Sequence, residues 1–205
     1  VGKTVAKALG LYNRSGDPFS GSTNPKTAGN GSIMRLAPVV LYYVDDYDTA
    51  LNEAERSSRT THQATEALFA CRYLAHILYR CIYLNVDKAS ITAEFKEIAP
   101  TETLQALLDK TYRDKTANEI SSSGYVVACL EAALWAFEQT DTFESALLLA
   151  ANLGDDSDTV AAVCGQIAGA YYGEQAIPSH WLAVLFERER IEAIAKQLIG
   201  ARSYI

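Results

Sequence analysis

The sequence lacks the features that mark membrane, nucleic-acid-binding and disulfide-stabilised proteins. No apolar run reaches the length of a membrane-spanning helix, so we expect no membrane partner. Basic residues form no cluster and the formal net charge is −7, which disfavours non-specific binding of nucleic acid. The 205 residues are enough for one domain with a sizeable core, and we expect a single domain over residues 1–205.

Cysteine is scarce, and no two cysteines have the Cys-x-x-Cys spacing. Cys71 and Cys81 fall in one predicted helix, where ten residues separate them by about 15 Å, too far for a disulfide. Cys129 and Cys164 also lie in apolar stretches, so all four are predicted to be buried thiols. Because reduced cysteines are typical of the cytoplasm, a cytoplasmic location is predicted.

The chain has no convincing strand alternation and no sequence repeat. Helical periodicity predicts an all-α protein, a compact orthogonal bundle of about eight to ten helices. A loop rich in Gly, Ser, Asn and Pro is predicted over residues 12–31, and a loop of this length is often functional. A turn is predicted over residues 178–181. The predicted helices span residues 1–11, 32–44, 45–58, 62–84, 88–98, 101–112, 125–137, 143–152, 160–173 and 182–198.

The most informative stretch is residues 154–159 (GDDSDT), which lies between two apolar runs. Burying unpaired carboxylates beside apolar residues is costly, whereas Mg²⁺ and Ca²⁺ prefer carboxylate and hydroxyl oxygens. Asp156 and Asp158 are two positions apart, so they would not share a face inside a helix. In a turn that enters a helix they can converge on one ion, and the stretch is therefore a candidate cation site.

Three other interpretations of this stretch compete. Asp and Ser at a helix start often serve only as caps. An EF-hand loop is excluded because Ala161 stands where that loop requires Gly, and no Glu closes it. The pattern from Asp156 to Val160 also resembles the nucleophile motif of haloacid dehalogenase-type phosphatases, but that motif ends a buried strand and residues 145–153 are predicted to be helical.

Three more polar clusters precede apolar helices. Residues 29–35 (GNGSIMR) could present N–H groups to phosphate, although a plain turn and cap explains the same pattern. His62 would either cap the following helix or point its ring into a cleft, and Tyr125 would either stack on a ring or pack in the core. If these helix starts meet residues 154–159 at one end of the bundle, they form a polar cleft with carboxylates, N–H donors and one histidine.

Taken together and in this order, the motifs resemble those of the ADP-ribosylglycohydrolases, a family that includes the dinitrogenase reductase-activating glycohydrolase. The resemblance covers nearly the whole chain, and several motifs in order are far more specific than any one of them. It rests on residues 29–38 (GNGSIMRLAP), 61–62 (TH), 123–127 (SGYVV), 130–137 (LEAALWAF), 154–159 (GDDSDT) and 165–173 (GQIAGAYYG).

The resemblance implies an all-α hydrolase that cleaves the glycosidic bond between ADP-ribose and a protein side chain or small acceptor. It implies two Mg²⁺ or Mn²⁺ ions, with Asp156, Asp158 and Thr159 as metal ligands. The expected partner is an ADP-ribosylated protein or a small molecule that contains ADP-ribose. The substrate-binding residues implied by the resemblance are Asn30, Gly31, Ser32, His62, Gly124 and Tyr125.

One departure from the family pattern concerns the other half of the metal shell. Family members carry an N-terminal segment with a Thr-Asp-Asp motif and a catalytic acidic residue, and no equivalent precedes Gly29 here. Asp45 and Asp46 follow Val44 rather than Thr, and they are no substitute. We therefore expect an N-terminally truncated chain, a chain completed by a partner, or an inactive relative that keeps the fold. Truncation would expose an apolar face, which predicts self-association.

Overall fold

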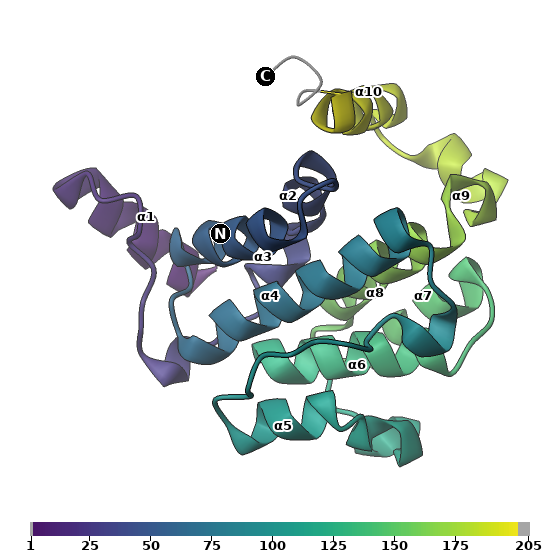
Figure 1. Ribbon diagram of the computed structural model, residues 1–205, viewed down its shortest axis with the longest axis horizontal. Helices are drawn as coiled ribbons and strands as arrows, with labels where there is room; N and C mark the ends of the chain where they lie inside the picture. The colour runs from purple at the N-terminus through teal and green to yellow at the C-terminus, as the bar shows by residue number, and fades with distance from the viewer. Residues whose placement is uncertain (1, 201–205) are drawn as a thin grey trace.

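The computed structural model describes residues 2–200, which form helices joined by loops (Figure 1). Strand-like pairing within this range is confined to two isolated bridges, one between Ser22 and His62 and one between Gly29 and Tyr125. The predicted all-α bundle of about eight to ten helices is confirmed. The α-helices of residues 2–200 are α1 (Lys3–Ser15), α2 (Ala37–Tyr42), α3 (Tyr47–Arg59), α4 (Thr65–Tyr79), α5 (Glu102–Leu108), α6 (Val126–Glu138), α7 (Phe143–Ala151), α8 (Ser157–Tyr172), α9 (Ser179–Val184) and α10 (Arg188–Gly200).

Helices α4, α6 and α8 form the centre of the bundle. Apolar residues occupy nearly every side of α4 and α6, and a helix of that kind is stable only when it is buried. Helix α4 packs against α3 and α6, while α8 packs against α6 and α7. The four cysteines are free and buried, as predicted. None of the helices within residues 2–200 is both long and apolar enough to cross a membrane.

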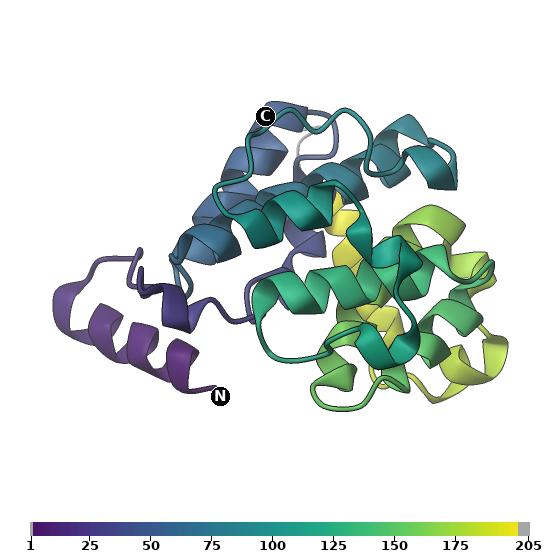
Figure 2. The same cartoon turned by 90° about the horizontal axis from the view of Figure 1, so that it is seen from below.

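Helices α1 and α10 lie at the periphery. Helix α1 stands at the margin of the molecule in both views (Figure 1 and Figure 2). Helix α10 packs on α2, and the segment before it leaves Val184 and Phe186 82% and 84% exposed. Exposed apolar side chains of this kind are compatible with self-association, which stays a prediction.

The helix predicted over residues 88–98 is wrong. Only a 3₁₀ turn, Lys88–Ser90, forms there, and Glu94 adopts a left-handed backbone with φ of 66°. Side chains of α4 and of the π-helical turn that follows it, Arg80–Leu84, bind carbonyl groups that a helix would need for its own hydrogen bonds. His76 is bonded to the Ala93 carbonyl at 2.8 Å, and Arg80 donates to the Ser90 carbonyl at 3.1 Å.

Three other boundaries also differ from the predictions. The helix predicted over residues 182–198 is divided, because Glu187 has φ of 54° between α9 and α10. The turn predicted over residues 178–181 is instead the start of α9, which Pro178 precedes. The first helix continues to Ser15, and Gly16 ends it in the left-handed conformation that favours glycine.

Candidate functional site

Some helices begin with a side-chain cap and others do not. At α3 the Asp46 side chain accepts a hydrogen bond from the Thr49 N–H, and at α7 the Thr142 hydroxyl accepts one from the Ser145 N–H. No side chain caps the start of α4, α6 or α8. The first N–H groups of a helix have no partner within the helix, so these uncapped starts are suited to binding an anion.

The four polar clusters of the sequence come together at one place, which we name the four-segment junction: residues 29–32, 61–62, 122–125 and 154–159. Asn30 joins the first and third segments, because its N–H donates to the Gly124 carbonyl at 3.0 Å. The Asp156 N–H donates to the Ser122 carbonyl at 3.1 Å, which joins the third and fourth segments. The predicted convergence of helix starts is therefore present in the fold.

Asp156 lies at the start of α8, yet its carboxylate does not cap the helix. One oxygen, Oδ2, accepts a hydrogen bond of 2.6 Å from the Asn30 side-chain amide, which lies 126 residues earlier in the chain. The other oxygen, Oδ1, accepts a bond of 3.1 Å from the Thr159 hydroxyl. The cap interpretation is therefore wrong for Asp156. The phosphatase interpretation also fails, because helix α7 rather than a strand leads into this turn.

The donor atoms at the start of α8 are hard oxygens, the type that a divalent cation prefers. Asp156 is half-buried and already oriented, Thr159 is buried, and Asp158 is exposed one position before it. Within residues 2–200, however, no three His, Cys, Asp or Glu side chains gather into a group that could hold a metal ion. The residues thus fit one side of a cation site and leave the rest of its shell to other groups.

His62 lies against the backbone of the glycine-rich turn. A Cβ atom added to Gly31 would come within 2.9 Å of the ring carbon Cε1, so only glycine leaves room for this ring. A Cβ atom on Gly29 would lie 3.5 Å from Nε2. The ring is nearly buried, at 3% exposure, and its other nitrogen, Nδ1, is 2.8 Å from the Thr61 hydroxyl.

The surroundings of His62 favour the neutral form of its ring. Burial lowers the pKa of its imidazole, and the positive charge of Arg35 lowers that pKa further. The Arg35 guanidinium donates to the Thr61 hydroxyl at 2.8 Å and to the Gly31 carbonyl at 3.1 Å. Sequence reasoning missed this role of Arg35, although the residue belongs to the GNGSIMR motif.

Tyr125 and Ser32 lie at the junction, and both side chains contact residues of helix α4. The Tyr125 hydroxyl donates to Glu66 at 2.6 Å, which fixes the ring between α4 and α6. Burial, followed by this bond to Glu66, raises the pKa of Tyr125 to about 12. Ser32 is buried beside the Cys71 thiol. Gly124 instead faces Asp156, because an added Cβ would lie 3.5 Å from Oδ2. The substrate-binding roles of these residues stay predictions.

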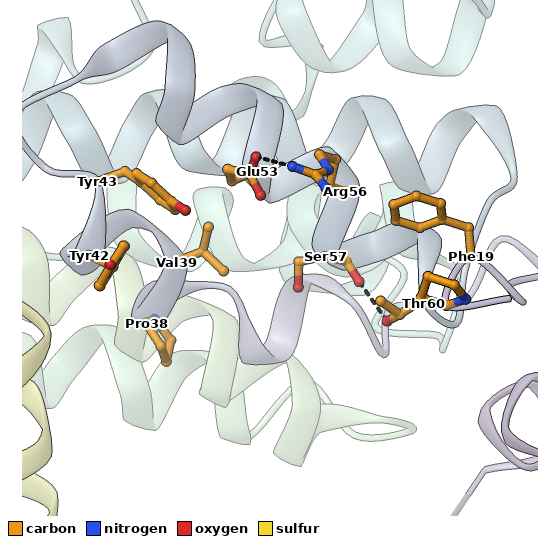
Figure 3. A pocket seen from close by; sticks show the side chains of 10 residues that line it. Phe19, Pro38, Val39, Tyr42, Tyr43, Glu53, Arg56, Ser57 and Thr60 are labelled. Carbon is orange, nitrogen blue, oxygen red and sulfur yellow. Dashed lines mark hydrogen bonds and ion pairs between the residues drawn. The ribbon is translucent and has the colours of Figure 1, made fainter. Parts of the chain in front are cut away.

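A surface hollow of about 480 Å³ adjoins the junction (Figure 3). Phe19 and Thr60 line one end of it, and Tyr42 and Tyr43 line the other. Its wall is shared with the junction, because Arg35 donates from behind to the Ser57 carbonyl and to the Thr60 hydroxyl, at 3.1 and 3.2 Å. Residues of α2 and α3 supply most of its lining, together with Pro18 and Phe19.

Comparison with known proteins identifies similar chains along almost the whole length. The family model described as ADP-ribosylglycohydrolase matches residues 1–204. An ADP-ribosylarginine hydrolase Tri1 from Serratia proteamaculans is 41% identical, over 97% of this chain and 54% of the relative. An ADP-ribosyl-[dinitrogen reductase] glycohydrolase from Rhodospirillum rubrum is 30% identical, over 90% of this chain and 60% of the relative.

A solved structure gives the same result for the fold. It is named ADP-ribosylglycohydrolase-related protein complex and superposes with a TM-score of 0.86 at 41% identity. The match covers 97% of this chain and 68% of the other. The chain spans about half the length of the curated relatives it matches, 54% and 53% for two hydrolases of the same name.

Proposed function

The chain belongs to the ADP-ribosylglycohydrolase family, and on this premise we propose that it forms part of a hydrolase that releases ADP-ribose from modified arginine side chains. The acceptor is proposed from the relatives, two of which are named ADP-ribosylarginine hydrolases. The observation that carries the proposal is the 2.6 Å bond between Asn30 and Asp156, which joins two family motifs into one site.

Asp156, Asp158 and Thr159 would hold Mg²⁺ or Mn²⁺ from one side. Such ions orient ribose hydroxyls and activate water, which suits cleavage through an oxocarbenium-like state. The chain's own contribution is positioning. Asn30 and Thr159 fix the Asp156 carboxylate, the uncapped starts of α6 and α8 offer N–H donors to the diphosphate, and the neutral His62 lies beside the glycine turn.

A second candidate function is binding of ADP-ribose without hydrolysis. It is favoured by one observation, that residues 2–200 contain no group of three potential metal ligands of the His, Cys, Asp and Glu types. A relative with half a metal shell would keep the cleft and lose the chemistry.

Calorimetric titration of Mn²⁺ and then ADP-ribose, combined with an assay of ADP-ribose release from ADP-ribosylated arginine, tests both candidates. The matched variant is Asp156→Asn/Asp158→Asn, which keeps the side-chain shape and removes both charges. Release by the native chain that the double variant loses supports the hydrolase. Binding of both ligands without release supports the binding protein, and the absence of any binding contradicts both.

A further inference from the structure

Arg35 is half-buried, and hydrogen bonds to the protein hold its guanidinium in place. It lies in the 3₁₀ turn Ile33–Arg35, directly after the glycine-rich segment. Its guanidinium faces four acceptors. Nη1 donates to the Gly31 carbonyl, and the two N–H groups of Nη2 are shared among the Ser57 carbonyl and the Thr60 and Thr61 hydroxyls, of which Thr61 is nearest at 2.8 Å. A guanidinium has no acceptor atom and stays protonated, so every one of these bonds has a fixed direction.

The direction of the Arg35 bond determines where the Thr61 proton goes. A hydroxyl has one proton to donate, and Thr61 Oγ1 already accepts from Arg35 Nη2 at 2.8 Å. Thr61 is 7% exposed, and the other hydrogen-bonding group within reach of its hydroxyl among the described residues is Nδ1 of His62, at 2.8 Å. If Nδ1 carried a proton, the hydroxyl would accept twice and its own buried proton would have no partner, which is costly.

We propose that Arg35 and Thr61 are positioning residues that fix His62 as the neutral Nε2–H tautomer, and that this N–H is a donor to an oxygen atom of the bound ADP-ribose. In this arrangement Arg35 donates to Thr61, Thr61 donates to Nδ1, and the only ring proton is on Nε2. The inference rests on the proposed function for the identity of the ligand, but the tautomer itself depends on the protein alone.

The position of Nε2 fits this role. It makes no hydrogen bond to any other described residue, and it lies between Gly29 and Gly31, where added Cβ atoms would come within 3.5 and 3.3 Å. Both glycines flank Asn30, whose side-chain amide donates to Asp156. A donor held at this point has a fixed direction before the ligand arrives, which lowers the entropic cost of binding.

The tautomer can be measured directly by long-range ¹H–¹⁵N NMR of the histidine side chains at neutral pH. The chain has three histidines, and His62→Gln identifies the signals of His62. His76 is an internal reference for the Nε2–H form, because its Nε2 faces the Ala93 carbonyl, which can only accept. We expect His62 to show a protonated Nε2 and an unprotonated Nδ1.

Variants of two neighbouring threonines separate positioning from general stability. Thr61→Val removes the hydroxyl that reaches His62, while Thr60→Val removes a hydroxyl that also accepts from Arg35 but makes no bond to His62. We expect Thr61→Val to give a mixture of tautomers and roughly fivefold weaker binding of ADP-ribose, the effect of one misplaced hydrogen bond. Thr61→Ser should restore both, and Thr60→Val should change neither.

The outcomes distinguish this inference from the proposed function. An Nδ1–H tautomer in the native chain, or an unchanged tautomer in Thr61→Val, overturns the inference whatever the chain binds. An Nε2–H tautomer that responds to Thr61→Val, in a chain that binds no ADP-ribose, supports the positioning role and counts against the proposed ligand. If Thr61→Val does not fold, the comparison of Thr61→Ser with the native chain decides, since a lost Nε2–H form in Thr61→Ser overturns the inference.

Discussion

The hydrogen bond between Asn30 and Asp156 should contribute measurably to the stability of the fold. Asn30 is 9% exposed, the N···O distance is 2.6 Å, and the acceptor is a carboxylate. A hydrogen bond to a charged group is worth about 1.5–3 kcal/mol. A double-mutant cycle of Asn30→Ala and Asp156→Ala should therefore give a coupling energy in that range, measured by urea unfolding with linear extrapolation. The bond from Thr159 to Asp156 is lost in both arms of the cycle that contain Asp156→Ala, so it cancels.

A matched cycle on the surface calibrates this measurement. Glu53 and Arg56 are also 2.6 Å apart, but their side chains are 26% and 60% exposed. Exposed pairs of this kind contribute about 0.2–1 kcal/mol. If the coupling between Asn30 and Asp156 does not exceed that of the surface pair, the two motifs are not joined in solution, and the argument that they form one site fails.

The remaining predictions concern glycines and a buried histidine. Gly31→Ala should destabilise the protein by about 1–3 kcal/mol, because the new methyl would lie 2.9 Å from the His62 ring, whereas Gly29→Ala, with its nearest atom at 3.5 Å, should cost less in the same urea assay. Gly21→Ala should cost about 3 kcal/mol or more, since its Cβ would meet backbone atoms of residues 59–62 within 2.7 Å. Gly10→Ala on α1 should stabilise the protein by about 0.5–1 kcal/mol, because its Cβ would make only an ordinary contact of 3.6 Å with the Arg14 side chain. Burial lowers the pKa of His76 to about 4, so the unfolded state binds more protons than the folded state between about pH 4 and 6.5. The neutral His76 therefore contributes its full share to the free energy of unfolding above this pH range, and that share is lost as the pH falls through it. The loss should reach about 3 kcal/mol at most, and urea unfolding of the native chain and His76→Asn at pH 7.5 and 5 should show a smaller pH effect in the variant; equal effects would contradict the assignment.

The sequence was sufficient for the helical class, and it identified the motifs that would form a cleft if their helix starts met. In long segments such as the one that forms α4, the apolar residues recur with the period of a helix, and this pattern predicts a buried helix rather than a strand. The glycine turn, the histidine and the acidic stretch each precede such a segment, so their relative positions follow once the helix starts meet. Residues 88–98 could not be predicted in this way, because their conformation is determined by hydrogen bonds from His76 and Arg80 on another helix.

Within the site, the types of residue were predictable and the directions of the side chains were not. The pattern around Tyr125 does not show that its hydroxyl turns to Glu66, a residue 59 positions earlier. The role of Arg35 was equally hidden, because an arginine after a glycine-rich turn is compatible with binding a phosphate. In the structure, Arg35 is half-buried and its guanidinium faces four oxygen atoms of the protein, which indicates that it positions protein groups rather than a phosphate.

The direction of the Asn30 side chain changes the role that its motif predicts. The resemblance places it among the substrate-binding residues, yet its side-chain amide donates to Asp156, the predicted metal ligand. A carboxylate whose orientation is fixed by a hydrogen-bonded neighbour binds a cation with less reorganisation, and loss of such a neighbour typically costs 10–100-fold in metal affinity. Asn30→Ala should therefore weaken Mn²⁺ binding by about tenfold or more in calorimetry, while Asn152→Ala, an exposed asparagine bonded only within α7, should leave it unchanged. Equal Mn²⁺ affinities for both variants would show that Asn30 orients no metal ligand. That result would support its predicted role in substrate binding instead.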